Sequence, residues 1–244
     1  MQDALRTFGA ALGALDLELD WELLGQSYCE GDGATFFDDE LREHTLDTGL
    51  RFAEDVAQAL EERPGRSVYL GADVAELPVI LSEHLLLGRR VEWLNLEGPA
   101  TSELRRALAV VSAKVGVELP APSARALATI EPASCDLVWM VSVLTDPDAF
   151  PALHDALYRR TGGPLATGRG VLEEDRARAD ALVEEWLDRA APSAVLATSD
   201  EERRVIAPIV ARRGWKLSFA RGGRTTAIVG DRVRLGTLTH GGGA

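Results

Sequence analysis

The stretch Ser67-Val-Tyr-Leu-Gly-Ala-Asp-Val-Ala-Glu-Leu-Pro78 determines the fold expected for this chain. Its apolar, β-prone start ends at Gly71, and from Ala75 to Leu87 apolar residues recur at helical spacing. The stretch therefore predicts a strand, a tight turn and a helix, which together open an α/β sheet. Because such sheets bind ligands at the carboxyl ends of their strands, we expect Gly71 to Val74 to contact any bound cofactor.

The composition is that of an ordinary globular protein with an acidic surplus. Of 244 residues, 46% are hydrophobic and 27% are charged, and 39 acidic side chains outnumber 26 basic ones, for a net charge of −13. Surfaces that bind nucleic acid need clustered Lys and Arg, so we expect a small-molecule substrate and no nucleic-acid partner. The sequence has neither a signal-peptide pattern nor an apolar run that could cross a bilayer. We therefore expect a cytoplasmic protein with no membrane partner, and a homodimer stays open.

Strand and helix patterns alternate after the opening unit. Strands are expected at 90–96, 116–119, 135–144 and 193–198, and helices at 102–113, 150–160, 172–190 and 201–213, the last capped by Asp200. The nearly continuous apolar run from Cys135 to Leu144 is typical of a central strand. Near the end of the chain, the turn Arg221-Gly-Gly-Arg224 predicts a hairpin between β-prone runs at 215–220 and 225–229, before a last run at 233–238. The expected fold is a Rossmann-like α/β class: a mostly parallel seven-stranded sheet with helices on both faces and an antiparallel C-terminal hairpin.

An N-terminal helical cap or lid is expected over residues 1–65, before a Rossmann-like domain over 66–244. Leucines spaced by three and four residues between Asp3 and Gly25 predict one or two helices, and a second amphipathic pattern runs from Asp39 to Arg63. Four residues on that second helix could be imagined as metal ligands: Glu40, Glu43, His44 and Asp47. Since metal sites usually draw ligands from more than one element, we interpret them as a solvated charged face and expect no metal.

A glycine-bracketed aromatic loop, residues 26–39, joins the two helical patterns. It carries Tyr28, Phe36 and Phe37. Such loops are either lids over a substrate or plain connections held down by their aromatic side chains, and the sequence leaves both open. As a lid, the loop would bring these three side chains to the substrate.

Two segments resemble the class I S-adenosylmethionine-dependent methyltransferase family. They are Val68-Tyr-Leu-Gly-Ala72, at the family's first motif, and Asp136-Leu-Val-Trp-Met-Val-Ser-Val-Leu144, at its fourth strand; the order of elements is similar over 66–238. The resemblance implies S-adenosylmethionine as cofactor, held by Tyr69, Gly71, Ala72, Asp73, Asn95, Leu96 and Glu97. It also places catalytic residues after the fourth strand, at Ser142 and Asp146, with Thr145, Asp148 and His154 as further candidates on the acceptor side. Methyl transfer is a direct displacement, so alignment of the reactants can supply most of the catalysis.

The chain departs from the family pattern at the cofactor loop. Only Gly71 of the loop glycines is present, Asp73 stands at a later glycine, and Tyr69 stands where an acidic residue is frequent. Asn95 replaces the acidic residue after the second strand, with Glu97 as a substitute.

Three functions compare differently with this pattern. The first is a methyltransferase acting on an oxygen or nitrogen atom of a small molecule. The alternative is a catalytically inactive methyltransferase-like protein that binds a partner or another metabolite. A nicotinamide dehydrogenase is disfavoured, because Asp73 would put a carboxylate where the phosphates bind.

Overall fold

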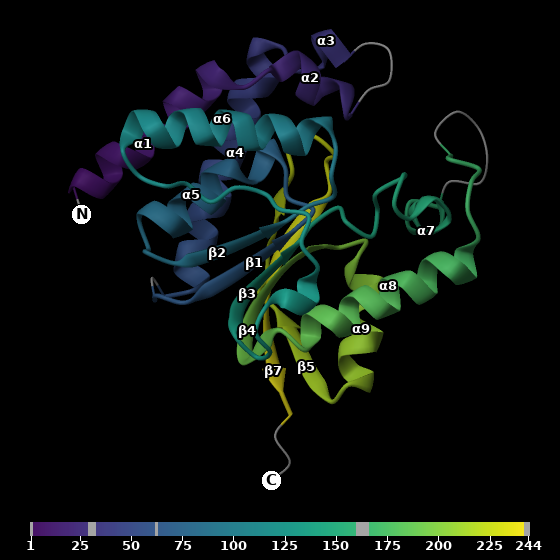
Figure 1. Ribbon diagram of the computed structural model, residues 1–244. Coiled ribbons are helices and arrows are strands. Elements are labelled where there is room, and N and C mark those ends of the chain that lie inside the picture. Colours follow the sequence, from purple (N-terminus) through teal and green to yellow (C-terminus); the bar gives the residue numbers. More distant parts are fainter. Residues whose placement is uncertain (1, 29–32, 62, 160–165, 242–244) are drawn as a thin grey trace. The chain divides into compact units, whose positions relative to one another are not determined.

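The chain forms two compact units in the computed structural model (Figure 1). The structure describes residues 2–28, 33–61, 63–159 and 166–241. Unit 1 comprises Met1–Arg125 and Thr226–Gly230, and unit 2 comprises Ala126–Thr225 and Asp231–Ala244. The domain boundary predicted after residue 65 falls inside unit 1.

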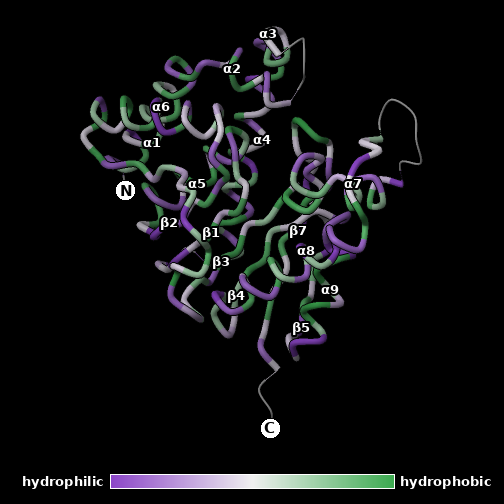
Figure 2. The backbone as a smooth tube through the Cα atoms, turned by 45° about the vertical axis from the view of Figure 1, so that its right-hand side comes forward, coloured by the Kyte–Doolittle hydropathy of each residue, from purple (hydrophilic) through white to green (hydrophobic). Residues whose placement is uncertain are grey.

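Unit 1 begins with four helices, in the region where the sequence predicts a helical cap. Its helices are α1 (Gln2–Glu18), α2 (Trp21–Gln26), α3 (Gly33–Phe36) and α4 (Asp39–Ala59). The side chain of Asp38 begins α4 by accepting a hydrogen bond from Leu41 N at 2.8 Å. Hydrophilic and hydrophobic residues alternate along these helices, as expected for amphipathic helices (Figure 2).

The strand, turn and helix predicted from Ser67 to Leu87 are present. β1 (Arg66–Leu70) ends at Gly71, whose φ of +64° lies in the left-handed region that glycine adopts at low cost. A short 3-10 helix, η1 (Val74–Glu76), then leads into α5 (Leu77–Leu85). The carbonyl of Leu94 accepts a hydrogen bond from Gly71 N at 2.9 Å, which fixes the turn against the next strand.

The remainder of unit 1 repeats the strand and helix. β2 (Arg90–Leu94) pairs with β1 in parallel, so the two strands end at the same edge. α6 (Pro99–Val115) follows and packs with α1 and α2. The backbone N–H of Asp20 donates to Glu103 Oε1 on α6 at 2.8 Å, so the cap is tied to the strand-and-helix part of this unit.

The strand predicted at 116–119 is wrong. Gly116 instead ends α6 in the left-handed conformation, with φ of +72°. The backbone N–H of Leu119 donates a hydrogen bond to the Ser112 hydroxyl at 3.0 Å, so this N–H is not available to pair with a neighbouring strand. The chain returns to the sheet edge only as an isolated bridge between Ser123 and Leu94.

Unit 2 is built on a parallel strand pair, β3 (Cys135–Met140) and β4 (Ala190–Ser199). Every residue of β3 except Asp136 is buried, as predicted for the most apolar run of the chain. Around these strands lie η2 (Leu127–Thr129), α7 (Pro151–Leu157), α8 (Leu172–Leu187) and α9 (Arg203–Arg212). Helix α9 begins at Glu202 and not at the predicted cap Asp200, because the Asp200 carboxylate binds Arg234 at 2.6 and 3.0 Å.

The C-terminal strands are β5 (Trp215–Phe219), β6 (Arg224–Thr225) and β7 (Arg232–His240). The expected hairpin partners were the runs at 215–220 and 225–229, and that pairing is wrong. Both β5 and β6 pair with β7, in antiparallel orientation, and β7 in turn pairs with β4. β7 is nine residues long and can pair its backbone with several strands, whereas β6 has only two residues to offer to a partner.

The fold class predicted from the sequence is confirmed. The described residues contain seven strands, with parallel pairs joined through helices and an antiparallel C-terminal arrangement, as in Rossmann-like α/β proteins. Among the described residues, none of the helices combines the length and the apolar character needed to cross a membrane.

Candidate functional site

The turn after β1 in unit 1 holds three of the predicted cofactor residues, Gly71, Ala72 and Asp73. Gly71 is exposed, while the carbonyl of Ala72 accepts two hydrogen bonds, from Trp93 Nε1 at 2.9 Å and Asn95 Nδ2 at 3.0 Å. Asp73 caps η1: its Oδ1 accepts from Val74 N at 2.8 Å, and its own N–H donates to the Glu76 side chain at 2.9 Å. The turn is therefore fixed by its own side chains.

Three more of the predicted cofactor residues, Asn95, Leu96 and Glu97, follow β2. Asn95 makes a second hydrogen bond within the protein, because its Oδ1 accepts from Leu96 N at 2.9 Å. Leu96 is 75% exposed, although it is large and apolar. The exposed Glu97 makes a two-point ion pair with Arg105 of α6, at 2.7 and 2.8 Å, and this hydrogen bonding lowers the pKa of Glu97. The Glu97 carboxylate, which Arg105 fixes in position, thus lies next to the exposed apolar side chain of Leu96.

Tyr69 does not take part in this turn. Its hydroxyl and that of Ser67 both donate to the carboxylate of Glu83 on α5. Arg89 completes the network with an ion pair to Glu83 at 2.7 Å, and all four side chains are buried. Burial raises the pKa of Glu83 and, together with the nearby Glu83 charge, that of Tyr69. Position 69 therefore presents no acidic group to the turn, and its tyrosine is bound to a buried glutamate.

The three aromatic residues predicted to contact substrate form one cluster in unit 1. Tyr28 and Phe36 stack with ring centroids 5.4 Å apart, and Phe37 meets both rings edge-on. The Tyr28 hydroxyl donates to Asp73 Oδ2 at 3.2 Å, so the cluster reaches the turn after β1. Burial, followed by the Asp73 charge, raises the pKa of Tyr28, and burial raises that of Asp73. Residues 29–32 of this loop lie outside the described residues.

The predicted catalytic residues, Ser142 and Asp146, belong to unit 2 and follow β3. Asp146 holds its own turn, since its Oδ1 accepts from Asp148 N at 2.8 Å and Ala149 N at 2.7 Å. Ser142 has a φ of +60°, an uncommon conformation for a residue other than glycine. Its hydroxyl donates to Asp231 Oδ2 at 3.4 Å.

The sequence did not indicate that Tyr158 and Asp231 would lie beside Ser142. Tyr158 donates its hydroxyl to Asp231 Oδ2 at 2.6 Å, from the end of α7 to the residue before β7. Burial raises the pKa of Asp231, and burial followed by the hydrogen bond to Asp231 raises that of Tyr158. Gly230-Asp231 predicted only a turn, and no local pattern links it to a residue 73 positions earlier.

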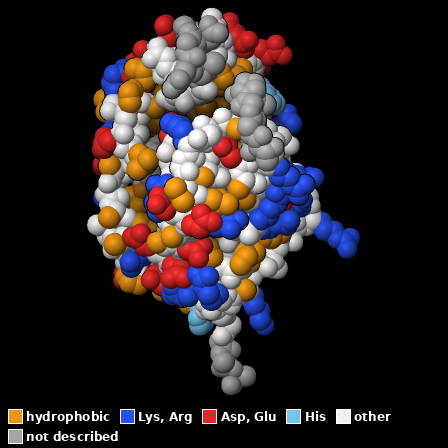
Figure 3. Space-filling view, turned by 90° about the vertical axis from the view of Figure 1, so that its right-hand side faces the viewer, with side chains coloured by type: hydrophobic (Ala, Val, Ile, Leu, Met, Phe, Trp, Pro, Cys, Tyr) orange, Lys and Arg blue, Asp and Glu red, His pale blue; other side chains and the backbone are white. Residues whose placement is uncertain are grey.

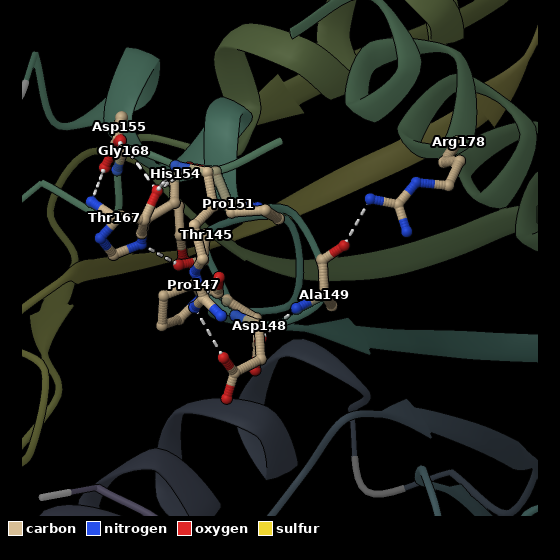
Figure 4. A network of polar contacts seen from close by, with 12 residues as sticks. Thr145, Pro147, Asp148, Ala149, Pro151, His154, Asp155, Thr167, Gly168 and Arg178 are labelled. Atoms are coloured by element: carbon tan, nitrogen blue, oxygen red, sulfur yellow. Dashed lines mark hydrogen bonds and ion pairs between the residues drawn. The ribbon is translucent and has the colours of Figure 1, made fainter. Parts of the chain in front are cut away.

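The remaining polar candidates of unit 2 hold the loops around α7 (Figure 4). Buried His154 donates from Nδ1 to the carbonyl of Thr145 at 2.5 Å, and its ring meets that of Tyr158 edge-on. Asp148 pairs with Arg169 at 2.9 Å in the same network. These contacts give His154 and Asp148 structural partners beside the Ser142 segment.

No family model and no curated protein matches this chain. Solved structures do. A SAM-dependent methyltransferase from Aquifex aeolicus is 13% identical over 83% of this chain and 98% of its own, with a TM-score of 0.48. TrmN from Thermus thermophilus is 17% identical over 80% of this chain and 52% of its own, with a TM-score of 0.45.

A third solved structure is a 16S rRNA methyltransferase, RsmC of T. thermophilus, in complex with AdoMet and guanosine. It is 13% identical over 72% of this chain and 35% of its own, with a TM-score of 0.38. The chain therefore spans about half of TrmN and about a third of RsmC. Similarity of this degree assigns no activity to the chain.

Proposed function

We propose that the chain is an S-adenosylmethionine-dependent methyltransferase with its cofactor site at the carboxyl ends of β1 and β2. The observation that carries this proposal is the exposed pair Leu96 and Glu97 at the end of β2, opposite the exposed turn at Gly71. A nucleoside presents a flat apolar base and two ribose hydroxyl donors. An exposed leucine suits the base, and a carboxylate can accept from both hydroxyls.

The residues at this edge fit that role. Arg105 already orients the Glu97 carboxylate through two hydrogen bonds, which lower the pKa of Glu97. Gly71 lacks a side chain that would cover the turn, so its backbone can approach the methionine part of the ligand. S-adenosylmethionine would supply a methyl group on a sulfonium. In this proposal Tyr28, Phe36 and Phe37 of unit 1 hold the acceptor.

Calorimetric titration with S-adenosylmethionine and with its demethylated product tests the cofactor site. We expect saturable heat with both. Glu97→Gln can accept at only one oxygen, so it should weaken binding by about 10- to 100-fold, the loss expected for one hydrogen bond to a charged group. Glu54→Gln, an exposed carboxylate on α4, is the matched control and should bind as the original chain does. Absence of heat at millimolar cofactor would overturn the proposal.

We propose a small molecule as the methyl acceptor. The net charge of −13 argues against a phosphate backbone. On the face shown in Figure 3, a group of basic side chains lies on the right, and acidic and basic side chains mix below it. Radiolabelled cofactor would be incubated separately with a metabolite extract and with total RNA. We expect label in the metabolite fraction; label in RNA would overturn the choice of acceptor.

A second function is favoured by a different observation at the same turn. The side chains of Asp73 and Asn95 make hydrogen bonds within the protein, and Tyr69 is buried with its hydroxyl bonded to Glu83. A turn fixed in this way is compatible with a catalytically inactive methyltransferase-like protein that binds a partner or another metabolite. Mass spectrometry of small molecules that copurify with the native protein distinguishes the two: S-adenosylmethionine or its product supports the enzyme, and a different metabolite supports the binding protein.

A further inference from the structure

A surface groove runs between α1 and α4 in unit 1. Its volume is about 590 Å³, and among the described residues its lining comes from these two helices. The apolar part of the lining consists of three half-buried leucines and two glycines: Leu12, Leu46, Leu50, Gly9 and Gly13. Both helices pack on α5, so the groove lies between two helices that share one support.

The two glycines on the α1 side of the groove are not required by the described part of the fold. Gly9 and Gly13 are exposed inside the helix, neither has a positive φ, and a Cβ added at either would meet nothing within 4 Å. Glycine within a helix is less stable than alanine. What the two glycines provide is a smooth wall that another backbone can approach closely.

The apolar surface of α1 continues past the glycines in both directions. Leu5, one turn before Gly9, is 51% exposed, and Leu17, one turn after Gly13, is 85% exposed. Residues four apart lie on the same face of a helix, so these four positions form one line along α1. A helix of 17 residues is roughly 25 Å long. A surface of this length suits an elongated partner, such as another helix, better than a compact small molecule.

The charged residues that line the groove leave it acidic. Asp39 forms an ion pair with Arg42, and Asp47 pairs with a neighbouring arginine of α4 at 2.6 Å. Asp16 on α1 and Glu43 on α4 also line the groove, and neither has an ion-pair partner among the described residues. Each helix therefore contributes one uncompensated carboxylate, which favours a partner with positively charged side chains.

We propose that the groove between α1 and α4 binds an amphipathic helix of another protein, whose apolar side chains enter the groove and whose basic side chains face Asp16 and Glu43. Helices that bind in grooves present apolar anchors at i, i+3, i+4 and i+7, and the leucines and open glycine positions of the groove suit such anchors. A second copy of this chain is disfavoured as the partner, because its net charge of −13 is repelled by an acidic groove. The inference goes beyond the proposed function, and the proposed cofactor residues do not line the groove.

The test measures fluorescence anisotropy of labelled helical peptides with the full chain. The first peptide consists of leucine and lysine, with its leucines at i, i+3, i+4 and i+7. The second has glutamate in place of every lysine, and the third has the leucines and lysines in shuffled order. We expect saturable binding of the first peptide only, and we expect that binding to weaken as the salt concentration rises.

Two variants separate the groove from the rest of the surface. Gly13→Leu places a side chain in the groove and should weaken the leucine–lysine peptide by about 10-fold or more, the effect of overpacking a contact. The variant should stay folded, because leucine is a better helix former than glycine. Ala109→Leu adds a leucine at an exposed position of α6 outside the groove and should leave the affinity unchanged.

The charge preference has its own variant. Asp16→Asn combined with Glu43→Gln should weaken the leucine–lysine peptide by about 3- to 10-fold, as expected for the loss of two exposed ion pairs. Equal binding of the glutamate or the shuffled peptide, or unchanged affinity in Gly13→Leu, would overturn the proposal. Sedimentation of the chain alone tests the other occupant: a dimer that Gly13→Leu dissociates would show that a second copy fills the groove, and would also overturn the proposal.

Discussion

The hydroxyl of Tyr28 donates a hydrogen bond to Asp73 Oδ2 at 3.2 Å, so the residue that follows α2 is joined to the turn that follows β1. The two lie 45 residues apart in the chain. Tyr28 also stacks on Phe36, so one side chain links the aromatic cluster of the cap to the proposed cofactor turn. If this loop moves, either the hydrogen bond to Asp73 breaks or the turn after β1 moves with the loop.

We predict that Tyr28→Phe lowers the free energy of unfolding by about 1 kcal/mol, the usual net value of one hydrogen bond. The substitution keeps the stack on Phe36 and removes only the donor to Asp73. Urea unfolding measures the change. Tyr28→Ala should cost more, because it also removes the ring; an unchanged free energy of unfolding in Tyr28→Phe would contradict a role for the hydroxyl.

The turn at Gly71 supports a second prediction. Gly71→Ala should destabilise the protein by about 1 to 2 kcal/mol, because an alanine at φ of +64° brings its Cβ too close to the backbone. Gly98→Ala is the control: its φ of −179° is extended, nothing lies within 4 Å of an added Cβ, and its loss should be smaller because only the N-cap preference for glycine over alanine is lost. Thermal unfolding measures the stability of both variants. A similar loss of stability in the two would refute the claim that the positive φ of Gly71 disfavours alanine.

Asn95→Asp is predicted to lower the stability of the protein and weaken cofactor binding. This holds although the methyltransferase family that the sequence resembles frequently has an acidic residue at this position. The Asn95 amide donates to the carbonyl of Ala72 at 3.0 Å, and a carboxylate would place an oxygen against that carbonyl. We expect a loss of about 1 to 3 kcal/mol in urea unfolding, the cost of leaving a buried polar group unpaired or opposed. In the cofactor titration, Asn95→Asp should bind more weakly than the original chain. Tighter binding would show that residue 95 contacts the ribose directly.

The sequence predicted local features well and long-range ones poorly. The strand and turn around Gly71 follow from a few adjacent residues, so both were predictable. Tyr158 and Asp231 meet only because α7 and β7 are placed by the whole of unit 2, and no local pattern shows that. The hairpin expected around Arg221 to Arg224 failed for a related reason: turn residues show where the chain reverses, but longer β7 offers each strand a better partner.

A final prediction concerns Glu202, which is fully buried at the start of α9. Its Oε1 accepts from Leu144 N at 2.9 Å, and its Oε2 accepts from Thr198 and Ser199 at 3.1 to 3.3 Å. Because donors face both oxygens, Glu202→Gln must turn an NH₂ group toward another donor. We expect a loss of about 1 to 3 kcal/mol in the free energy of unfolding.

The pH dependence of this loss has a definite sign. Burial raises the pKa of Glu202 above the ordinary value of 4.5, although its hydrogen bonds act in the opposite direction. A raised pKa in the folded state means that the folded protein holds the proton more tightly than the unfolded chain does. The stability that this proton contributes is therefore complete below pH 4.5 and is lost as the pH rises through the folded-state pKa. Glutamine does not titrate, so the stability gap between the original chain and Glu202→Gln should narrow from pH 4.5 upward in urea unfolding series. A gap that widens with pH would show that the hydrogen bonds outweigh burial and that the pKa of Glu202 is lowered.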